Sequence, residues 1–445
     1  MSVKKLNLFD VTMLMVSFVI GMGIFRTPVN VAKNSPDVFV FFAAWIAGAI
    51  IALCGALTYA EIGSRYPVTG GYYKVFSYAY HPSIAFGVNC IILISNAASL
   101  SGVALIGAEY ISAVLFPAEE NRRLVQVIIA IACILIFYGI NLAGLKMSAR
   151  AQNVLMMVKI GMIILLITPL FFADAHAANA VSSKTVSNPA LMEYIKAFGL
   201  GLVAVSFTNG GYQQTINFGE EVQNPSRNVP RAIFMGILII AALYLTINYA
   251  YVKVIGFENL KTAENISAIM ATHVFGTAGG KIISLLLFLS VLAYVNALLM
   301  SNPRVMEAMS NEGVLPKMFG QRTSGHNVLF TSLSLFAALS ALIVFWAETF
   351  DRILSFTIFL DCFGMALSAA TIFILRKRTR HLDGSGIYKM KLYPLLPVVF
   401  IAAYTFVAIS IFIDKPQTAL LGLGILAAFI GLYFVVKGNT KKVDK

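Results

Sequence analysis

Two apolar stretches of the sequence are interrupted by glycine and polar residues that could bind a small charged molecule. The interruptions are GMGIF at residues 21–25 and SFTNGGY at residues 206–212. A helix that restarts after Gly23 exposes free N–H groups and the positive end of its dipole, which favour a carboxylate. A helix that ends before Asn209 exposes free carbonyls, which favour an ammonium group. These residues predict a site for a small substrate with an anionic end, a cationic end or both, and a zwitterionic amino acid matches both.

The elements that carry these interruptions are predicted to be membrane-spanning helices. Of the 445 residues, 59% are hydrophobic and 12% are charged, and the mean hydropathy is +0.82. Soluble domains carry about 25% charged residues. A helix needs about 20 apolar residues to cross the hydrocarbon core of a bilayer. Twelve segments reach this length, at residues 9–33, 38–62, 83–115, 123–142, 150–172, 193–219, 230–255, 279–308, 326–346, 352–376, 393–413 and 417–437.

The twelve segments divide into two blocks of five and a final pair within a single membrane transport domain, residues 1–445. The blocks are residues 9–172 and 193–376, and the last two helices span 393–437. An odd number of crossings in the first block makes the second enter the membrane from the opposite side, so the repeats are inverted. Each interruption lies in the first helix of its block, which is typical of a transporter's substrate site. The alternative is that the glycines only let helices pack closely.

The net charge of +13 does not indicate a nucleic-acid partner, because the basic residues gather in loops. Most of the 33 Lys and Arg residues fall on the side of the N-terminus. Basic loops stay in the cytosol, so we expect a multi-pass protein of the cell membrane with both termini cytosolic. The densest basic cluster, residues 376–380, is expected to orient the chain and to contact anionic lipid headgroups.

The residue types that support metal binding, disulfides or catalysis are not grouped in this sequence. The four cysteines fall inside apolar segments, so we expect neither disulfides nor a metal site; they are Cys54, Cys90, Cys133 and Cys362. No hydrolase triad or ATP-binding loop is recognisable. We therefore expect a secondary transporter that is not an enzyme and has no cofactor.

Four stretches of sequence resemble a known family when they are taken in order. They are GMGIF at 21–25; YAEIG at 59–63 with YPVTGGY at 66–72; FTNGGY at 207–212 with GEEVQNPSRNVPR at 219–231; and NEGVLP at 311–316. Together they resemble the amino acid-polyamine-organocation superfamily, and within it the L-type amino acid transporters and their bacterial relatives. The resemblance implies a LeuT-like, all-α fold of two inverted five-helix repeats plus two helices, with the first and sixth helices broken, and alternating access around a central amino acid site.

The same resemblance implies which residues contact the substrate. In the family, N–H groups of the first break hold the substrate carboxylate, and carbonyls of both breaks hold its amino group. Carried over here, the carboxylate side is Met22, Gly23 and Ile24, and the amino side is Ile20, Ser206 and Phe207.

An aromatic residue before the second break acts in the family as an outer lid, and this position is Phe207, the expected gate. Its alternative role is as a lipid-facing side chain. The sequence departs from the family at Met22, where a small hydroxyl residue is usual, and at Thr208 and Asn209. These two polar residues favour substrates with small or polar side chains.

Three ionisable residues inside predicted helices need separate consideration. Lys159 is about 13 Å beyond Arg150 along its helix, a depth that strains the alternative of a snorkelling lysine. In the family a lysine in this region replaces a bound cation, which implies contacts of Lys159 with carbonyls near Gly21 and with the hydroxyl of Ser290. Glu109 is expected at a solvated outer rim. The role of the deeper Asp361 stays open, with a place beside the outer vestibule as one possibility.

The function favoured by these observations is sodium-independent exchange of neutral L-amino acids. A proton-coupled symporter of the same fold is the nearest alternative, and a non-transporting membrane sensor is the alternative from another class. The segment between the third and fourth predicted helices contains no cysteine. We therefore expect no disulfide-linked ancillary subunit of the kind that some L-type relatives carry.

Overall fold

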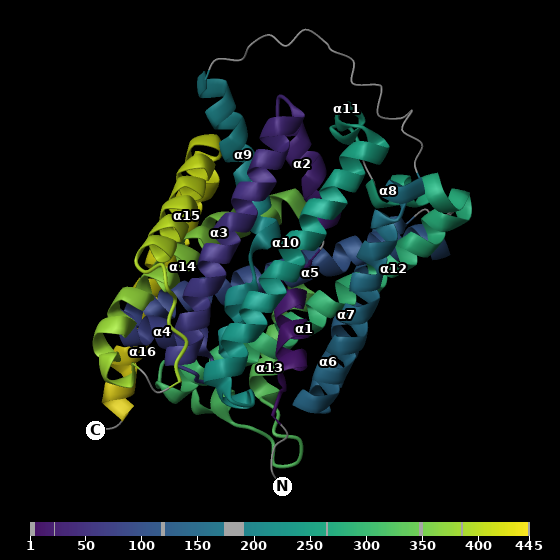
Figure 1. Cartoon of the computed structure of the whole chain (residues 1–445). Helices are drawn as coiled ribbons and strands as arrows, with labels where there is room; N and C mark the ends of the chain where they lie inside the picture. The colour runs from purple at the N-terminus through teal and green to yellow at the C-terminus, as the bar shows by residue number, and fades with distance from the viewer. Residues whose placement is uncertain are drawn as a thin grey trace.

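The computed structural model of the chain is a bundle of helices (Figure 1). It describes residues 5–21, 23–116, 121–172, 191–263, 266–346, 350–383 and 386–443. The first half contains α1 (Leu8–Val19), η1 (Gly23–Phe25), α2 (Thr27–Asn34), α3 (Val38–Arg65), α4 (Gly71–Ala79), α5 (Pro82–Leu115), α6 (Arg122–Leu142), α7 (Leu145–Ile167), α8 (Pro169–Phe172) and α9 (Leu191–Asn209). The second half contains η3 (Tyr212–Asn217), η4 (Gly219–Glu221), α10 (Pro225–Ile255), α11 (Phe257–Leu260), α12 (Ile266–Asn311), η5 (Lys317–Gly320), α13 (Phe330–Trp346), α14 (Phe350–Arg378), η6 (Arg380–Leu382), α15 (Leu395–Asp414) and α16 (Pro416–Val443).

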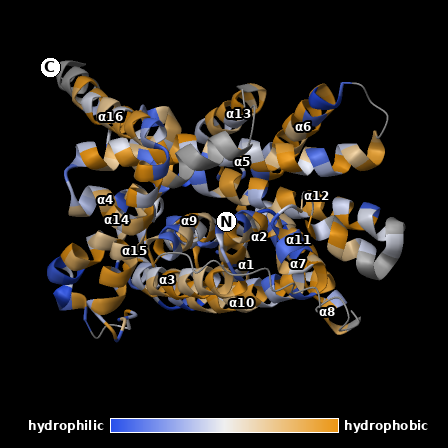
Figure 2. Ribbon diagram, turned by 90° about the horizontal axis from the view of Figure 1, so that it is seen from above, coloured by the Kyte–Doolittle hydropathy of each residue, from blue (hydrophilic) through white to orange (hydrophobic). Residues whose placement is uncertain are grey.

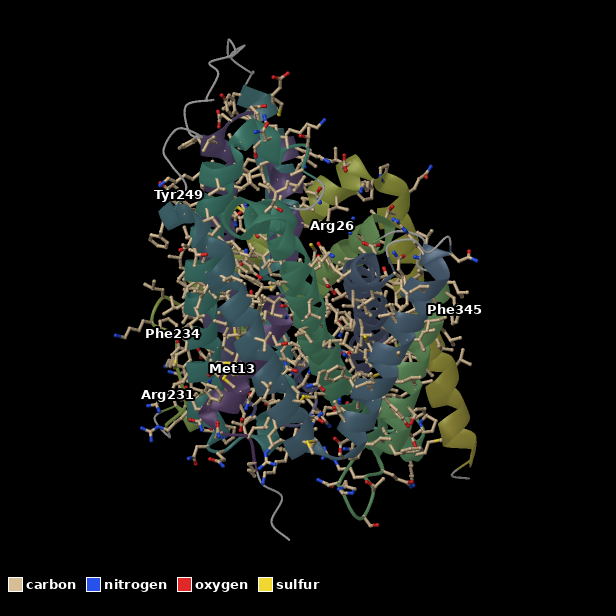
Figure 3. The ribbon with its side chains drawn as sticks, turned by 90° about the vertical axis from the view of Figure 1, so that its right-hand side faces the viewer. Met13, Arg26, Arg231, Phe234, Tyr249 and Phe345 are labelled. Carbon is tan, nitrogen blue, oxygen red and sulfur yellow. The ribbon has the colours of Figure 1, made fainter. Side chains whose placement is uncertain are left out.

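The chain is an all-α, multi-pass membrane protein. Within its described residues, nine helices are long and apolar enough to cross a membrane, and Leu8–Val19 and Phe330–Phe345 are shorter apolar helices. Hydrophobic residues occur in the helices on every side of the bundle when it is seen from above (Figure 2). Phe234, Tyr249 and Phe345 lie at its outer surface, with 42%, 51% and 61% of their areas exposed (Figure 3). An apolar surface of this kind suits contact with lipid.

The broken helices lie near the centre of the bundle, whereas α6 and α16 lie at its rim (Figure 2). The long helices α5 and α12 pack along each other, as do α3 and α10. The helix α1 begins and α16 ends at the same end of the molecule (Figure 1). We call this end, which carries Leu6, Arg65 and Glu221, the terminal face.

The first predicted interruption is a real break between α1 and α2. The start of α1 is fixed by a capping box, because the Asn7 side chain accepts from the Asp10 N–H and Asp10 accepts from the Asn7 N–H. The helix ends at Val19, and the chain then forms the short η1 turn before α2 begins. The prediction that this helix is broken is confirmed.

The second break follows Asn209, where α9 ends and the chain continues as η3 and η4. Gly211 has a φ of +111°, in the region that favours glycine. A Cβ at this position would also collide with the carbonyl oxygen of Phe18. Glycine is therefore required here, because it lets the second break approach the end of α1.

Several elements differ from the sequence-based expectation. The sixth segment was expected to be helical over residues 193–219, but regular α-helix ends ten residues earlier, at Asn209, because the glycine pair that follows breaks it. The amphipathic helix α4 follows α3 and was not predicted. The predicted helix 279–308 is part of the longer α12, which is interrupted at Gly276 with a φ of +63°. Each of the twelve predicted segments coincides with one or more helices, and twelve crossings stay a prediction.

Candidate substrate site

A cavity lies between the two breaks. Its lining includes Gly21 and Gly23 from the first break, Ser206 and Thr208 from α9, and polar residues of the second break. A second wall comes from α5, α12 and α14, with Ile92, Asn96, Ser99, Val103, Tyr294, Leu298, Asp361, Cys362 and Met365. Its volume is about 80 Å³, measured as the space open to the centre of a water-sized sphere. A single water needs roughly 10–15 Å³ by this measure, so the cavity suits a molecule of only a few heavy atoms.

The N–H groups at the start of η1 are available to an anion. Gly23 and Ile24 open this turn, so their N–H groups have no partner inside it. Neither N–H donates a hydrogen bond to any other described residue. Gly23 lines the cavity, while the Ile24 side chain is fully buried. Met22 lies outside the described residues. The geometry thus suits the predicted carboxylate contact at Gly23, with the neighbouring Ile24 contributing its backbone.

The amino side of the site contains a free hydroxyl. Ser206 lines the cavity and makes no hydrogen bond with a described residue. Its Oγ can therefore donate to, or accept from, a ligand. Phe207 belongs to α9, but its side chain lies outside the described part of the structure, so its predicted lid role stays a prediction.

Lys159 is fully buried on α7, and its Nζ donates to the carbonyl oxygen of Ile20 at 2.5 Å. This oxygen is the one that the resemblance assigned to the substrate amino group, so the lysine already occupies it. The predicted contact of Lys159 with Ser290 is not formed. The Ser290 hydroxyl instead donates to the carbonyl of Leu286 in its own helix, at 2.8 Å. The Lys159 ammonium therefore contacts the first break, next to Gly21. This contact joins α7 to the end of α1 but does not extend to Ser290.

Thr208 and Asn209 point in different directions. The Thr208 hydroxyl donates to Thr27 at 2.8 Å and lines the cavity. The Asn209 amide donates to the carbonyl of Val205 at 3.2 Å and packs close to Gly48 of α3. Thr208 is therefore part of the cavity lining, whereas Asn209 is not. The expectation that Asn209 contacts the substrate is not supported by this geometry.

Two further contacts hold the breaks together. The Tyr244 hydroxyl of α10 donates to the carbonyl oxygens of Val19 at 3.2 Å and of Thr208 at 3.3 Å, so one hydroxyl contacts both breaks. A Cβ on Gly23 would lie 2.8 Å from the Thr208 hydroxyl oxygen, which shows how closely η1 approaches α9. Sequence reasoning missed Tyr244, and its only signal was a polar aromatic residue within an apolar helix.

Charged residues form an ion-pair network around Glu61 at the terminal face. The Glu61 carboxylate is fully buried and accepts from Arg65 at 2.7 Å and from Arg376 at 2.8 and 2.6 Å. It also accepts the Met390 N–H at 2.9 Å, which ties the segment before α15 to α3. Arg65 continues the network to Asp383 at 2.7 Å. Glu61 therefore forms ion pairs with Arg65 of its own helix and with Arg376 of α14.

A second charged network on the same face centres on Glu221. Arg304 of α12 pairs with it, and Arg322 pairs with it at 3.1 Å and with Glu307 at 2.6 Å. Burial raises the pKa of Glu221, but Arg304 and Arg322 lower it by more, so the net pKa lies below its usual range. Glu221 therefore stays ionised and paired at neutral pH.

Two acidic residues with open roles are now placed. Glu109 is exposed on α5 and lies within electrostatic reach of Arg26 and Arg123. Asp361 of α14 lines the cavity itself, so it belongs to the site, not to a rim.

The chain is similar to known proteins over most of its length. The profile of the family described as Amino acid permease matches residues 6–435. The serine/threonine exchanger SteT of Bacillus subtilis (strain 168) is 30% identical over 437 residues, which cover 96% of this chain and 95% of that protein. The Asc-type amino acid transporter 1 of Mus musculus is 23% identical, covering 97% of this chain and 81% of its own length.

The large neutral amino acids transporter small subunit 2 of Mus musculus is 24% identical, again covering 97% of this chain and 81% of its own length. These similarities extend over nearly the whole sequence, including both breaks. The chain belongs to the amino acid permease family of the amino acid-polyamine-organocation superfamily, and it resembles the L-type transporters and their bacterial relatives.

Proposed function

We propose that this protein exchanges neutral L-amino acids across the cell membrane without sodium. The observation that carries the proposal is the cavity between the two breaks, with unpaired N–H groups at Gly23 and Ile24 on one side and the free Ser206 hydroxyl on the other. The substrate carboxylate binds the N–H groups, as anions do at helix N-termini. Its ammonium binds the Ser206 region, including the carbonyls of Ser206 and Phe207. The exchangers and transporters among its relatives support the same function.

The membrane domain in this proposal consists of two inverted repeats, residues 9–172 and 193–376, followed by residues 393–437. Each repeat begins with one of the broken helices, which places a break from each repeat at the cavity. Alternating access then consists of motion of the broken helices and their neighbours relative to the rest of the bundle. Phe207 closes over the substrate as the outer lid.

The terminal face is cytosolic in this proposal, because most Lys and Arg residues belong to its loops. The structure then corresponds to a state closed toward the cytosol, since the networks of Glu61 and Glu221 bridge that face. On the other side, α2 packs against α9 and α5 packs against α14. Extensive packing between these two pairs is absent from the described residues, which supports an opening of the cavity on that side in this proposal.

Lys159 supplies the positive charge at the first break, in place of a dissolved cation. Its ammonium holds the Ile20 carbonyl and so links α7 to the end of α1. A fixed charge of this kind removes the need for sodium. The chain is expected to work without a cofactor and without a disulfide-linked subunit.

Reconstitution of the purified chain into proteoliposomes tests the proposal. Uptake of labelled L-serine and L-alanine is measured into vesicles that are empty or preloaded with the unlabelled amino acid, in sodium or choline buffer. We expect uptake that needs internal amino acid and is equal in both buffers. Uptake into empty vesicles that follows an imposed pH gradient would establish proton symport instead. Binding without any exchange would establish a sensor, and dependence on sodium would refute the assigned role of Lys159.

A further inference from the structure

Asp361 is the one formally charged side chain among the described residues that line the cavity. The lining contains no other Asp or Glu and no Lys, Arg or His. The Asp361 carboxylate makes no hydrogen bond or ion pair with any described residue. It is partly exposed, and the open space beside it is the cavity. An unpaired carboxylate at this depth is costly unless it has a functional partner.

The other polar groups on the same wall are already paired. Ser99 of α5 and Tyr294 of α12 share a hydrogen bond of 2.9 Å between their hydroxyls. Asn96 donates to Asn302 at 2.7 Å. These hydrogen bonds connect α5 to α12, and they leave the paired side chains fewer donors and acceptors for a ligand. Asp361 therefore presents the strongest acceptor without a partner on this wall.

The position of Asp361 relates it to the side chain of a substrate. In the proposed function the two breaks hold the carboxylate and the ammonium of a bound amino acid, and Asp361 lines the same cavity from another element, α14. The cavity is small, about 80 Å³ by the measure given above. An amino acid that is anchored at both breaks has its β-substituent left to contact the rest of the lining, which includes Asp361, Cys362 and Met365 of α14.

We infer that Asp361 accepts a hydrogen bond from the side chain of the transported amino acid, so that the cavity selects small amino acids with a donor on the β-carbon. The donor is a hydroxyl or a short ammonium, which present the same chemistry to a carboxylate. This inference rests on the proposed transport function and adds to it the class of side chain that is preferred. An apolar side chain of equal size leaves the carboxylate unpaired and is rejected.

Matched pairs of ligands isolate the hydrogen bond from size. Serine and 2-aminobutyrate differ by a hydroxyl in place of a methyl group, and O-methylserine and norvaline differ by an ether oxygen that cannot donate. Each is used as a competitor of labelled alanine exchange by the reconstituted full chain. A hydrogen bond to a charged acceptor predicts a preference of about 10- to 100-fold for serine over 2-aminobutyrate. O-methylserine and norvaline should compete equally.

Substitution of Asp361 then tests its role. The measured quantity is the ratio of the affinities for serine and 2-aminobutyrate within each variant, because a general loss of affinity affects both equally. Asp361→Ala should bring the ratio of serine to 2-aminobutyrate near one. The exposed carboxylate of Asp414 at the end of α15 provides the control, and Asp414→Ala should keep the wild-type ratio. A ratio in Asp361→Ala equal to that of the wild type would overturn the inference and leave the proposed exchange function intact.

A second variant covers the case in which Asp361→Ala does not fold, as judged by gel filtration in detergent. Asp361→Asn keeps an acceptor but removes the charge. It should reduce the preference for 2,3-diaminopropionate over 2-aminobutyrate by about 10-fold or more, because an ammonium gains most from a charged acceptor. An unchanged preference in Asp361→Asn would refute the inference. Failure of the wild type to exchange any amino acid would instead refute the proposed function.

Discussion

Replacing Lys159 with methionine removes one charge and one hydrogen bond while it keeps most of the side-chain volume. The Lys159 ammonium is the sole described partner of the Ile20 carbonyl, at 2.5 Å. A hydrogen bond to a charged group contributes about 1.5–3 kcal/mol, and each 1.4 kcal/mol corresponds to about tenfold in an equilibrium. The substrate-ready form of the first break should therefore become about 10- to 100-fold less populated in Lys159→Met.

This loss should appear as weaker substrate binding, because the apparent affinity falls with the population of the competent form. The assay is serine exchange by proteoliposomes together with calorimetric binding in detergent. Lys196→Met provides the control, since Lys196 is exposed near the start of α9. Lys159→Ala should lose at least as much, because it also leaves a cavity. Normal exchange by Lys159→Met would show that the ammonium has no role at the break.

The remaining predictions concern the breaks and the terminal face. Gly23→Leu should abolish binding because its Cβ meets α9, while Gly139→Leu, on an exposed position of α6 with no neighbour, should bind normally in the same assay. Tyr244→Phe should weaken serine binding by about fivefold, from roughly 1 kcal/mol of lost hydrogen bonding, whereas the exposed Tyr249→Phe should not. The depressed pKa of Glu221 stabilises the fold above its unfolded value of about 4.3, and this stability is lost as the pH falls through the lower folded value. The contribution of Glu221 to thermal stability should therefore stay constant between pH 7 and 5, and Glu221→Gln should lower the melting temperature throughout that range. A loss of this contribution already at pH 6 would contradict the assignment.

The positions of both breaks could be predicted because glycine and polar residues inside an apolar run are a local signal. The depth of Lys159 in its helix indicated that this residue needs a partner, but the first break as that partner came from the family resemblance. The Ser290 side chain could not be placed from the sequence, since a helical hydroxyl can satisfy itself on its own backbone, as Ser290 does on Leu286.

Which buried side chains face the cavity was beyond the sequence. The helices α5, α9 and α14 are apolar on most sides, so periodicity does not indicate which face meets the substrate. Asn209 and Asp361 illustrate this point: the first packs toward α3, and the second lines the cavity. The amphipathic α4 was missed because it is short and lies between two strongly apolar helices.

The ammonium at Ile20 is covalently part of the polypeptide. In every conformation of the protein this charge stays attached to the chain and is never released into either compartment. A carrier of this kind moves no coupling ion downhill beside its cargo, so the gradient of the exchanged amino acid is the driving force that remains. In the proposed exchange, the total number of amino acid molecules on each side of the membrane stays constant while their identities are redistributed, and a cell gains one amino acid only by giving up another.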